Sequence, residues 1–410
     1  MADPKPVVGL DIGTSKVCVV VGQRFENSKT PEIIGFGTAP SSSLRKGVVS
    51  DIEETVSSVS SALEEAERIA GTSLSNVYLG INGAHISFLT SKGVIAVSRA
   101  SGEIGEDDVT RALEAAQAVS LPANSEIIHA IASSYTVDNQ QGITDPIGMN
   151  GVRLEAMAHI ITGSTPIIKN ITKSVSRTGV DINELVINPL ASSRACLTDR
   201  QKELGCALVD IGAGTTGIAI YEEGNLLYTA VLPIGSGHIT NDIAIGLRTS
   251  IDVAEQIKLE YGFATAKEIS KHETIDLSSL SKEEGKVPRH HVAEIIEARL
   301  NEIFSMVRSE LKKAGRDTLL PSGIILVGGG SKLPGLTDLA KEKLKLPCQI
   351  GFPMELKGVV EKVDDPVYAV AVGLMLWGID SEFGRGHFGF LKKGGPTVDK
   401  IKKWFKSFLP

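Results

Sequence analysis

Two aspartates, Asp11 and Asp210, each stand near the end of an apolar run and open a short turn of small and hydroxyl residues. Residues without bulky side chains let backbone N–H groups approach a phosphate, and hydroxyls and one lysine add donors. Two carboxylates brought together could hold a hydrated Mg²⁺. We therefore predict that the two turns grip one polyphosphate from both sides. The predicted phosphate-binding residues are Gly13, Thr14, Ser15 and Lys16 in the first turn and Gly212, Ala213, Gly214, Thr215 and Thr216 in the second.

The two turns belong to a sequence repeat. Residues 6–22, PVVGLDIGTSKVCVVVG, return as residues 206–224, CALVDIGAGTTGIAIYEEG, with the two aspartates in register. Each copy places two runs rich in Val and Ile around a glycine-containing loop, which predicts a β-hairpin. A single Asp-Ile-Gly tripeptide is more often an ordinary turn, but two copies in matching strand–turn–strand patterns favour a binding site. The repeat also predicts a duplicated chain.

A third glycine-rich segment follows an apolar run within residues 323–336. Three consecutive glycines leave a flat backbone surface on which a planar base can lie, and a helix is expected after Pro334. Many α/β loops carry such a triplet, so alone it is weak evidence. Its position after the two turns makes it a candidate base-binding loop. The candidate residues are Gly328, Gly329, Gly330 and Lys332.

The composition limits the classes of protein to which the chain can belong. With 410 residues, 42% hydrophobic and 22% charged, it is predicted to fold into at least two globular domains. A net charge of −7 argues against nucleic acid as a partner. The first residues do not read as a secretion signal and no apolar run is long enough to span a bilayer, so we expect a cytoplasmic protein. Buried free thiols are favoured over disulfides or a metal cage for the four dispersed cysteines, Cys18, Cys196, Cys206 and Cys348.

In their order along the chain, the two turns, the glycine triplet and two linking helices resemble the actin-like ATPase superfamily. Within it, residues 151–163, residues 233–262 and the basic-aromatic C-terminus are similar to the FtsA family of bacterial cell-division proteins. The resemblance covers the whole chain and implies ATP with Mg²⁺ held through water by Asp11 and Asp210. It implies an α/β, actin-like two-lobed fold of duplicated ribonuclease-H-like cores, with an inserted α+β subdomain and a C-terminal amphipathic helix.

The duplication and the resemblance together predict the domain boundaries. Each half carries one turn, one core and one smaller subdomain, and the linkers at residues 187–197 and 364–378 form the hinge. The predicted first core is residues 1–83 and 163–193 with a return helix at 366–380, the inserted α+β subdomain is 84–162, the second core is 194–241 and 323–365, and the helical subdomain is 242–322. In the inserted part, the runs HISFLT and GVIAVSR are expected to form strands, and residues 107–119 a helix.

Three polar side chains acquire roles from the resemblance. Glu255 and Lys258 lie three positions apart and share a helix face, and in the family such a pair faces the sugar and base of the nucleotide. In any other helix a solvated ion pair would be preferred. Asn188 stands near the start of the first linker, where brisk ATPases carry a water-orienting residue. Asparagine can orient water but cannot take its proton, so we expect tight binding of ATP and at most slow hydrolysis.

The C-terminus predicts a membrane-binding helix. Residues 381–395 are rich in glycine and read as a flexible linker, and residues 396–410 follow as an amphipathic helix. Docking of this helix on the protein itself is the less favoured alternative, because four lysines and two adjacent aromatic residues are unusual in a core helix. One helix should bind anionic lipid reversibly, and an array of them strongly. The predicted membrane-binding residues are Val398, Ile401, Lys402, Lys403, Trp404, Phe405, Lys406, Phe408 and Leu409.

The resemblance implies a cytoskeletal adaptor at the division site, on the cytoplasmic face of the membrane. Its expected partners are the C-terminal peptide of the tubulin-like protein FtsZ, further copies of itself in filaments, and downstream division proteins. Arg299 could lie at the rim of a peptide groove, although an intrachain ion pair is equally favoured. A metabolic kinase would need a carboxylate base that no motif supplies. A pilus-assembly adaptor would not explain the C-terminal helix, and a chaperone would need a separate peptide-binding domain.

Overall fold

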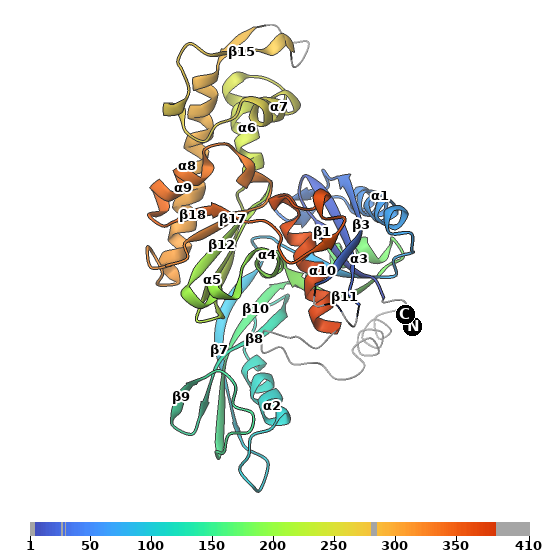
Figure 1. Ribbon diagram of the computed structural model, residues 1–410, viewed down its shortest axis with the longest axis vertical. Coiled ribbons are helices and arrows are strands. Elements are labelled where there is room, and N and C mark those ends of the chain that lie inside the picture. The colour runs from blue at the N-terminus through green and yellow to red at the C-terminus, as the bar shows by residue number, and fades with distance from the viewer. Residues whose placement is uncertain (1–4, 26–27, 29, 280–284, 383–410) are drawn as a thin grey trace. The chain divides into compact units, whose positions relative to one another are not determined.

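The computed structural model describes residues 5–25, 28, 30–279 and 285–382 (Figure 1). The described chain forms two compact units. The smaller unit consists of Leu89–Ser120 and Ala130–Ile160, and the larger unit contains the other described residues, among them Leu121–His129. The predicted membrane-binding helix at 396–410 and most of the predicted linker lie outside the described residues.

The first sheet of the larger unit has six strands in the order β11-β6-β1-β2-β3-β19. Its central strand β1 is antiparallel to β2 and parallel to β6. Helix α1 packs on β3, accepts a capping hydrogen bond at Asp51 and ends at Gly71, whose positive φ of 68° suits glycine. The strands are β1 (Val7–Ile12), β2 (Lys16–Gln23), β3 (Glu32–Pro40), β6 (Asn76–Ile81), β11 (Asp181–Ile187) and β19 (Lys357–Gly358), with α1 (Ile52–Ala70), α3 (Thr165–Ser176) and the short strands β4 (Leu44–Arg45) and β5 (Val48–Val49) around them.

The second sheet repeats this arrangement in five strands, in the order β14-β13-β12-β17-β18. Here β12 takes the place of β1, because it is antiparallel to β13 and parallel to β17. The duplicated α/β cores predicted from the sequence are therefore confirmed. The strands are β12 (Cys206–Ile211), β13 (Thr216–Glu222), β14 (Asn225–Leu232), β17 (Ile324–Val327) and β18 (Cys348–Ile350), with the helices α5 (Asp199–Leu204) and α9 (Leu336–Leu344).

Two helices with small residues link the cores. α4 (Asn188–Cys196) and α10 (Ala369–Glu382) pack against each other, and a Cβ on Gly373 would stand 1.8 Å from the carbonyl oxygen of Ala191. Glycine is therefore required at this crossing. A 3₁₀ turn, η5 (Pro366–Tyr368), precedes α10, and another, η4 (Val360–Lys362), follows β19.

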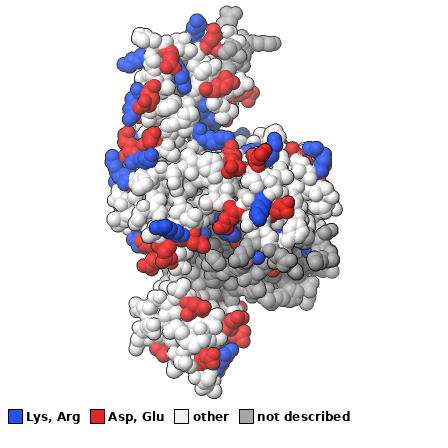
Figure 2. Space-filling view, in the orientation of Figure 1, with Lys and Arg blue, Asp and Glu red and all other residues white. Residues whose placement is uncertain are grey.

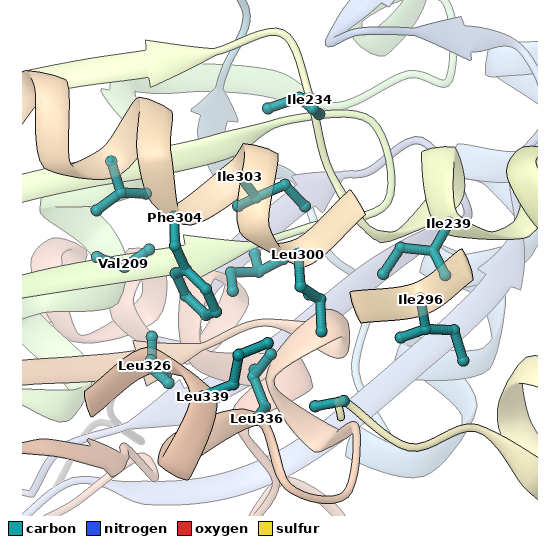
Figure 3. Packing of buried hydrophobic residues seen from close by; sticks show 14 of the residues in the cluster. Val209, Ile234, Ile239, Ile296, Leu300, Ile303, Phe304, Leu326, Leu336 and Leu339 are labelled. Carbon is teal, nitrogen blue, oxygen red and sulfur yellow. The ribbon is translucent and has the colours of Figure 1, made fainter. Parts of the chain in front are cut away.

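Helices inserted between β14 and β17 complete the second core. Along α8, residues Ile296, Leu300, Ile303 and Phe304 point into a cluster with Leu326 of β17 and with α9 (Figure 3). Each fully buried side chain of this kind contributes about 1.5–3 kcal/mol. The inserted elements are α6 (Ser236–Leu247), α7 (Ile251–Tyr261), η1 (Ala266–Glu268), β15 (Thr274–Asp276), η2 (Leu277–Ser279), β16 (Lys286–Pro288) and α8 (Arg289–Lys313).

The smaller unit is built on a four-stranded sheet of order β7-β10-β8-β9 with one helix. The runs HISFLT and GVIAVSR, expected to form strands, both contribute to one strand, β7, which spans Ser87–Ala96. Gly93 continues that strand and lets α2 approach, since a Cβ there would stand 2.0 Å from the carbonyl oxygen of Ala112. The elements are β7 (Ser87–Ala96), α2 (Glu106–Gln117), β8 (Ser125–Val137), β9 (Gln140–Ile143) and β10 (Arg153–Ser164).

Two further expectations are met in the described chain. All four cysteines are buried and free, as predicted. No helix among the described residues is both long and apolar enough to cross a bilayer. On the face seen in Figure 2, the described Lys and Arg side chains lie among Asp and Glu side chains.

Candidate functional site

The two predicted turns have the same backbone geometry. In the first hairpin Ile12 pairs with Val17, and the N–H of Gly13 donates to the carbonyl oxygen of Lys16 at 2.9 Å. In the second hairpin Ile211 pairs with Thr216, and the N–H of Gly212 donates to the carbonyl oxygen of Thr215 at 2.9 Å. Both turns therefore close four residues with the same hydrogen bond, and Thr215 occupies in the second turn the position of Lys16 in the first.

The two turns meet, as the sequence predicts. A Cβ on Gly214 would stand 2.5 Å from the hydroxyl oxygen of Thr14, so the backbone of the second turn lies against a side chain of the first. A second link runs from Asn82, just after β6, whose Nδ2 donates to the Thr215 hydroxyl oxygen at 2.9 Å. The residues that the repeat places far apart in the sequence thus form one cluster within the larger unit.

Two carboxyl groups stand just before the turns, of which Asp210 is buried and Asp11 is half-buried. Burial raises the pKa of Asp11 to about 6, although the hydrogen bond from Asn188 and the charge of Lys16 act in the opposite direction. Burial raises the pKa of Asp210 to about 7, and the negative charge of Asp11 adds to the effect. A divalent cation would favour the ionised form of both groups. The described residues contain no cluster of three or more His, Cys, Asp or Glu side chains suited to a metal, so the pair fits a cation that keeps most of its waters, as Mg²⁺ does.

Asn188, the first residue of α4, reaches into the same cluster. Its Nδ2 donates to Asp11 Oδ1 at 3.0 Å. Its Oδ1 is buried and has no hydrogen-bond partner among the described residues. Gly80 leaves space beside it, because a Cβ there would stand 2.7 Å from the Asn188 oxygen. A buried acceptor without a partner is costly, so this oxygen is suited to a water or a ligand donor.

The start of α6 holds the second turn from behind. The N–H groups of Ser236 and Gly237 donate to the carbonyl oxygens of Gly212 and Ala213, both at 2.8 Å. In a trans peptide the C=O and N–H point in opposite directions. The N–H groups of Ala213 and Gly214 therefore point away from α6, as a pair of adjacent donors suited to an anion.

The hydroxyl of Thr216 is part of this support. It is buried and donates to the carbonyl oxygen of Ile234 at 2.8 Å. This hydrogen bond links β13 to the segment that leads into α6. Its predicted role as a phosphate ligand stays a prediction.

The glycine triplet joins the cluster through its backbone. A Cβ on Gly328 would stand 2.3 Å from Asp210 Oδ1, and one on Gly330 would stand 2.5 Å from the side chain of Ile211. These two glycines are needed for the close approach of β12, and only Gly329 has open space beside it. The flat surface expected for a base is thus smaller than the triplet suggests.

A pocket of about 360 Å³ opens next to the triplet. Lys332 lies in its lining and forms an ion pair with Asp365, and the N–H of Gly328 donates to the carbonyl oxygen of Pro366 at 2.9 Å. Apolar and polar groups both line the pocket, a mixture that suits a planar heterocycle. The lining residues are Ser331, Lys332, Leu333, Pro334, Gly335, Thr337, Ile350, Phe352, Asp365 and Pro366.

Glu255 and Lys258 lie outside that lining. Lys258 Nζ is 2.7 Å from Glu255 Oε2 and donates to the Thr240 hydroxyl oxygen at 2.9 Å. The Thr240 hydroxyl also donates to Glu255. The pair therefore joins α7 to α6, and its predicted contact with a sugar and base stays a prediction.

Arg299 is engaged within the chain. Its guanidinium binds Asp242 on α6 through two hydrogen bonds of 2.6 and 2.8 Å, and it contacts Glu302 at 2.5 Å. An intrachain ion pair was one of the two alternatives predicted for Arg299. The other alternative, a contact with a partner peptide, stays a prediction.

Two residues of the cluster were missed from the sequence. Asn82 and Tyr368 appear in neither turn nor in the triplet, yet Asn82 binds Thr215, and the ring of Tyr368 lies 4.6 Å from Lys16 Nζ. The register of the sheets places Asn82 after β6 where Gly329 stands after β17. Extending the repeat to the fourth strand of each core would therefore have pointed to Asn82.

Two family models match the chain. The model described as cell division protein FtsA matches residues 207–373, and the model described as an SHS2 domain inserted in FtsA matches residues 83–162. A cell division protein FtsA from Pseudomonas aeruginosa is 40% identical over 98% of this chain and 97% of its own length. FtsA proteins of Bacillus subtilis and Escherichia coli are 41% and 36% identical, covering 90% and 99% of this chain and 82% and 98% of their own lengths.

Solved structures share the fold. A PilM–PilN type IV pilus biogenesis complex aligns with a TM-score of 0.65 at 18% identity, covering 91% of this chain and 98% of that one. MreB5 of Spiroplasma citri bound to ADP aligns with a TM-score of 0.53 at 14% identity, covering 93% and 99%. These likenesses confirm the predicted actin-like α/β fold with its inserted subdomain.

Proposed function

The chain belongs to the FtsA family of cell-division proteins, and we propose that it binds ATP with Mg²⁺ where its two hairpins meet. The observation that carries this proposal is the contact between Thr14 of the first turn and Gly214 of the second. Two turns with the same backbone bond, each preceded by an aspartate, form one binding surface. A polyphosphate is the ligand that such paired turns suit best.

Each part of the cluster has a role in this proposal. The N–H groups of Ala213 and Gly214 and the ammonium of Lys16 bind the phosphates. Asp11 and Asp210 hold a hydrated Mg²⁺, which neutralises phosphate charge. The base lies near Gly329 and Lys332, and Glu255 and Lys258 approach the sugar and base.

Asn188 suits a slow ATPase. Its unpartnered Oδ1 can accept a hydrogen bond from a water and orient it, but an amide cannot remove the proton. We expect the protein to remain in its ATP-bound state for long periods, which suits a protein that acts as a scaffold rather than as a metabolic enzyme.

Replacing Gly212 by Asp tests the nucleotide site. A Cβ at Gly212 would stand 3.2 Å from the Thr215 carbonyl oxygen, so any side chain there requires a small shift of this neighbour, and Asp adds a charge as well. A carboxylate facing the phosphates should weaken ATP binding at least about 100-fold in calorimetric titration, while the melting temperature stays within a few degrees. Gly212→Ala is the matched control and should keep most of the affinity. Unchanged ATP binding by the Asp variant would contradict the site.

The same proposal gives the C-terminal helix the role of membrane anchor. In the sequence of residues 396–410, apolar residues recur at helical spacing with lysines between them, and each lysine near an anionic lipid contributes about 1 kcal/mol. ATP-dependent filaments would bind a membrane through many helices at once, which raises the affinity without any new contact. The protein then acts on the cytoplasmic face of the membrane at the division site.

Sedimentation with vesicles tests the anchor. Full-length protein should pellet with vesicles that contain phosphatidylglycerol, and a chain ending at residue 395 should stay in the supernatant. Trp404→Glu combined with Phe405→Glu should also release the protein while ATP affinity is unchanged. Equal pelleting of all three forms would contradict the anchor.

Its partner in this proposal is FtsZ, whose C-terminal peptide docks on the helical subdomain, and other division proteins are recruited in turn. Arg299 and Asp242 form a surface ion pair on that subdomain, and an acidic peptide could compete for the arginine. Co-sedimentation should be seen with polymerised FtsZ and lost with FtsZ that lacks its C-terminal peptide. Arg299→Ala should weaken the interaction and Asp242→Asn should not. Binding that survives deletion of the peptide would contradict this docking mode.

A further inference from the structure

The ammonium of Lys16 in the first turn lies over an aromatic ring from a distant part of the sequence. Lys16 Nζ is 4.6 Å from the centroid of the Tyr368 ring. Both residues are half-buried, so water screens the contact only in part. A cation over the face of a tyrosine ring is attracted to its π electrons, and more strongly where water is partly excluded.

The segment that carries this ring also holds the base-binding loop. The carbonyl oxygen of Pro366 accepts the N–H of Gly328 at 2.9 Å. Asp365 pairs with Lys332 and accepts the N–H of Val367 at 2.9 Å, which fixes the start of η5. Residues 365–368 therefore contact the glycine triplet at one end and the first turn at the other.

A contact that orders the side chain of a lysine in advance strengthens its binding to a phosphate. Its four-carbon chain has many rotamers, and ordering them on binding costs up to about 2 kcal/mol. A ring that holds the chain before the ligand arrives removes part of this cost.

We propose that Tyr368 is a positioning residue, whose ring holds Lys16 in place for the phosphates of the nucleotide. Because η5 is hydrogen-bonded to the glycine triplet, the same segment sets the distance between the base-binding loop and the phosphate-binding lysine. The inference rests on the proposed nucleotide site and deepens it. A ligand must then carry its base and its phosphates at the distance that separates the base-binding loop from Lys16.

A purely structural role for Tyr368 makes a different prediction. If the ring only fills space beside α10, its loss would weaken the binding of every ligand, whether or not Lys16 is present. If the ring positions Lys16, its loss would weaken only the binding of phosphate-bearing ligands, and only while Lys16 is there. A double-mutant cycle separates the two.

The experiment measures the affinity of the full-length chain for ATP and for adenosine, each as a competitor of a fluorescent ATP analogue. The variants are Tyr368→Leu, Tyr368→Phe, Lys16→Met and the double variant of Lys16→Met with Tyr368→Leu. We expect Tyr368→Leu to weaken ATP binding about three- to tenfold, and Tyr368→Phe, which keeps the ring, to stay within about twofold of the wild type. In the Lys16→Met background Tyr368→Leu should have no further effect, and adenosine should bind all Tyr368 variants equally.

Three results would overturn the proposal: an unchanged or tighter ATP affinity of Tyr368→Leu, the same fold-loss in the Lys16→Met background, or an equal loss for adenosine. The melting temperature of each variant shows whether it has folded. Failure of the proposed function itself looks different, because then the wild-type chain would not bind ATP at all.

Discussion

The first and second hairpins have the same backbone and different chemistry. The first exposes Ser15, carries the cation of Lys16, and accepts one backbone hydrogen bond, from the Ser41 N–H to the Ser15 carbonyl oxygen at 3.1 Å. The second has no charged side chain in its turn and is held by two backbone hydrogen bonds from the start of α6 and by Asn82. The two turns therefore share one backbone shape but offer a ligand different groups. One hairpin supplies charge, and the other supplies fixed backbone donors.

The two aspartates also differ in the groups that surround them. Asp11 accepts a hydrogen bond from Asn188 and lies near the charge of Lys16, whereas the causes that shift the pKa of Asp210 all act to raise it. Asp210 is also only 7% exposed. Ionisation of Asp210 in the folded protein is therefore less favourable than ionisation of Asp11. The variants described below test this comparison.

The largest effect is expected at Asp210, whose pKa lies near 7 instead of its ordinary 3.8. A raised pKa means that the folded state binds the proton more tightly than the unfolded state, so its stabilising effect is complete below pH 3.8 and is lost as the pH rises through 7. Asp210→Asn should therefore stabilise the nucleotide-free, metal-free protein at pH 8 by roughly 2–4 kcal/mol. Denaturant unfolding measures the gain.

Asp11→Asn is the control for Asp210→Asn and should stabilise the protein less, because the pKa of Asp11 is raised only to about 6. Destabilisation by Asp210→Asn at pH 8, or an equal gain at pH 4, would show that the carboxyl group is not held in the unfavourable ionised state.

The second prediction compares substitutions at equivalent positions of the two hairpins. Lys16→Met should weaken ATP binding about 10- to 100-fold with little change in melting temperature, because it removes a charge-assisted contact to phosphate. Thr215→Val, at the matching position of the second hairpin, should change ATP affinity less than about threefold. Calorimetric titration of both variants gives the comparison. A larger loss of affinity in Thr215→Val than in Lys16→Met would reverse the assignment of charge to the first hairpin.

The third prediction is that the affinity of the protein for Mg²⁺ and ATP depends on pH. The cation requires ionised carboxylates, and the pKa values of about 6 and 7 place their protonation within reach. Affinity should fall about three- to tenfold between pH 8 and pH 6. In Asp210→Asn this dependence should be smaller and shifted to lower pH. A flat profile in the wild type would indicate that the two groups do not hold the cation.

The smallest effect concerns the support of the second hairpin. Thr215→Val leaves the Nδ2 of Asn82 without its acceptor, which should lower stability by about 1 kcal/mol. Asn82→Ala removes the donor and should cost a similar amount. The two changes combined should cost little more than either alone, because they break the same hydrogen bond. Fully additive losses in thermal unfolding would show that the bond is not formed in solution.

The sequence predicted the parts of the site that repeat and the meeting of the two turns, but it missed individual side-chain contacts between distant segments. Both hairpins, the paired cores and the helix after Pro334 follow from periodicity and self-similarity, because local patterns determine them. The bond from Asn82 to Thr215 and the ring of Tyr368 over Lys16 join residues far apart in the chain, and no local pattern encodes such pairs.

The sequence also did not show why individual glycines are required. Gly328 and Gly330 looked like a surface for a base, but they allow the triplet to pack against β12. Gly93 lies in a run that was expected to form a strand, and its lack of a side chain lets α2 approach that strand. In both places the missing information was the backbone that lies opposite the glycine, which only the folded chain supplies.

The most direct measurement of the central claim is the number of ATP molecules bound per chain. Calorimetric titration of the full-length protein with ATP in the presence of Mg²⁺ should give one site. Ser15→Asp and Gly212→Asp place one carboxylate in each hairpin, and each alone should abolish that site. Two sites per chain, or binding that survives a carboxylate in either hairpin at full affinity, would contradict a single ligand held by both.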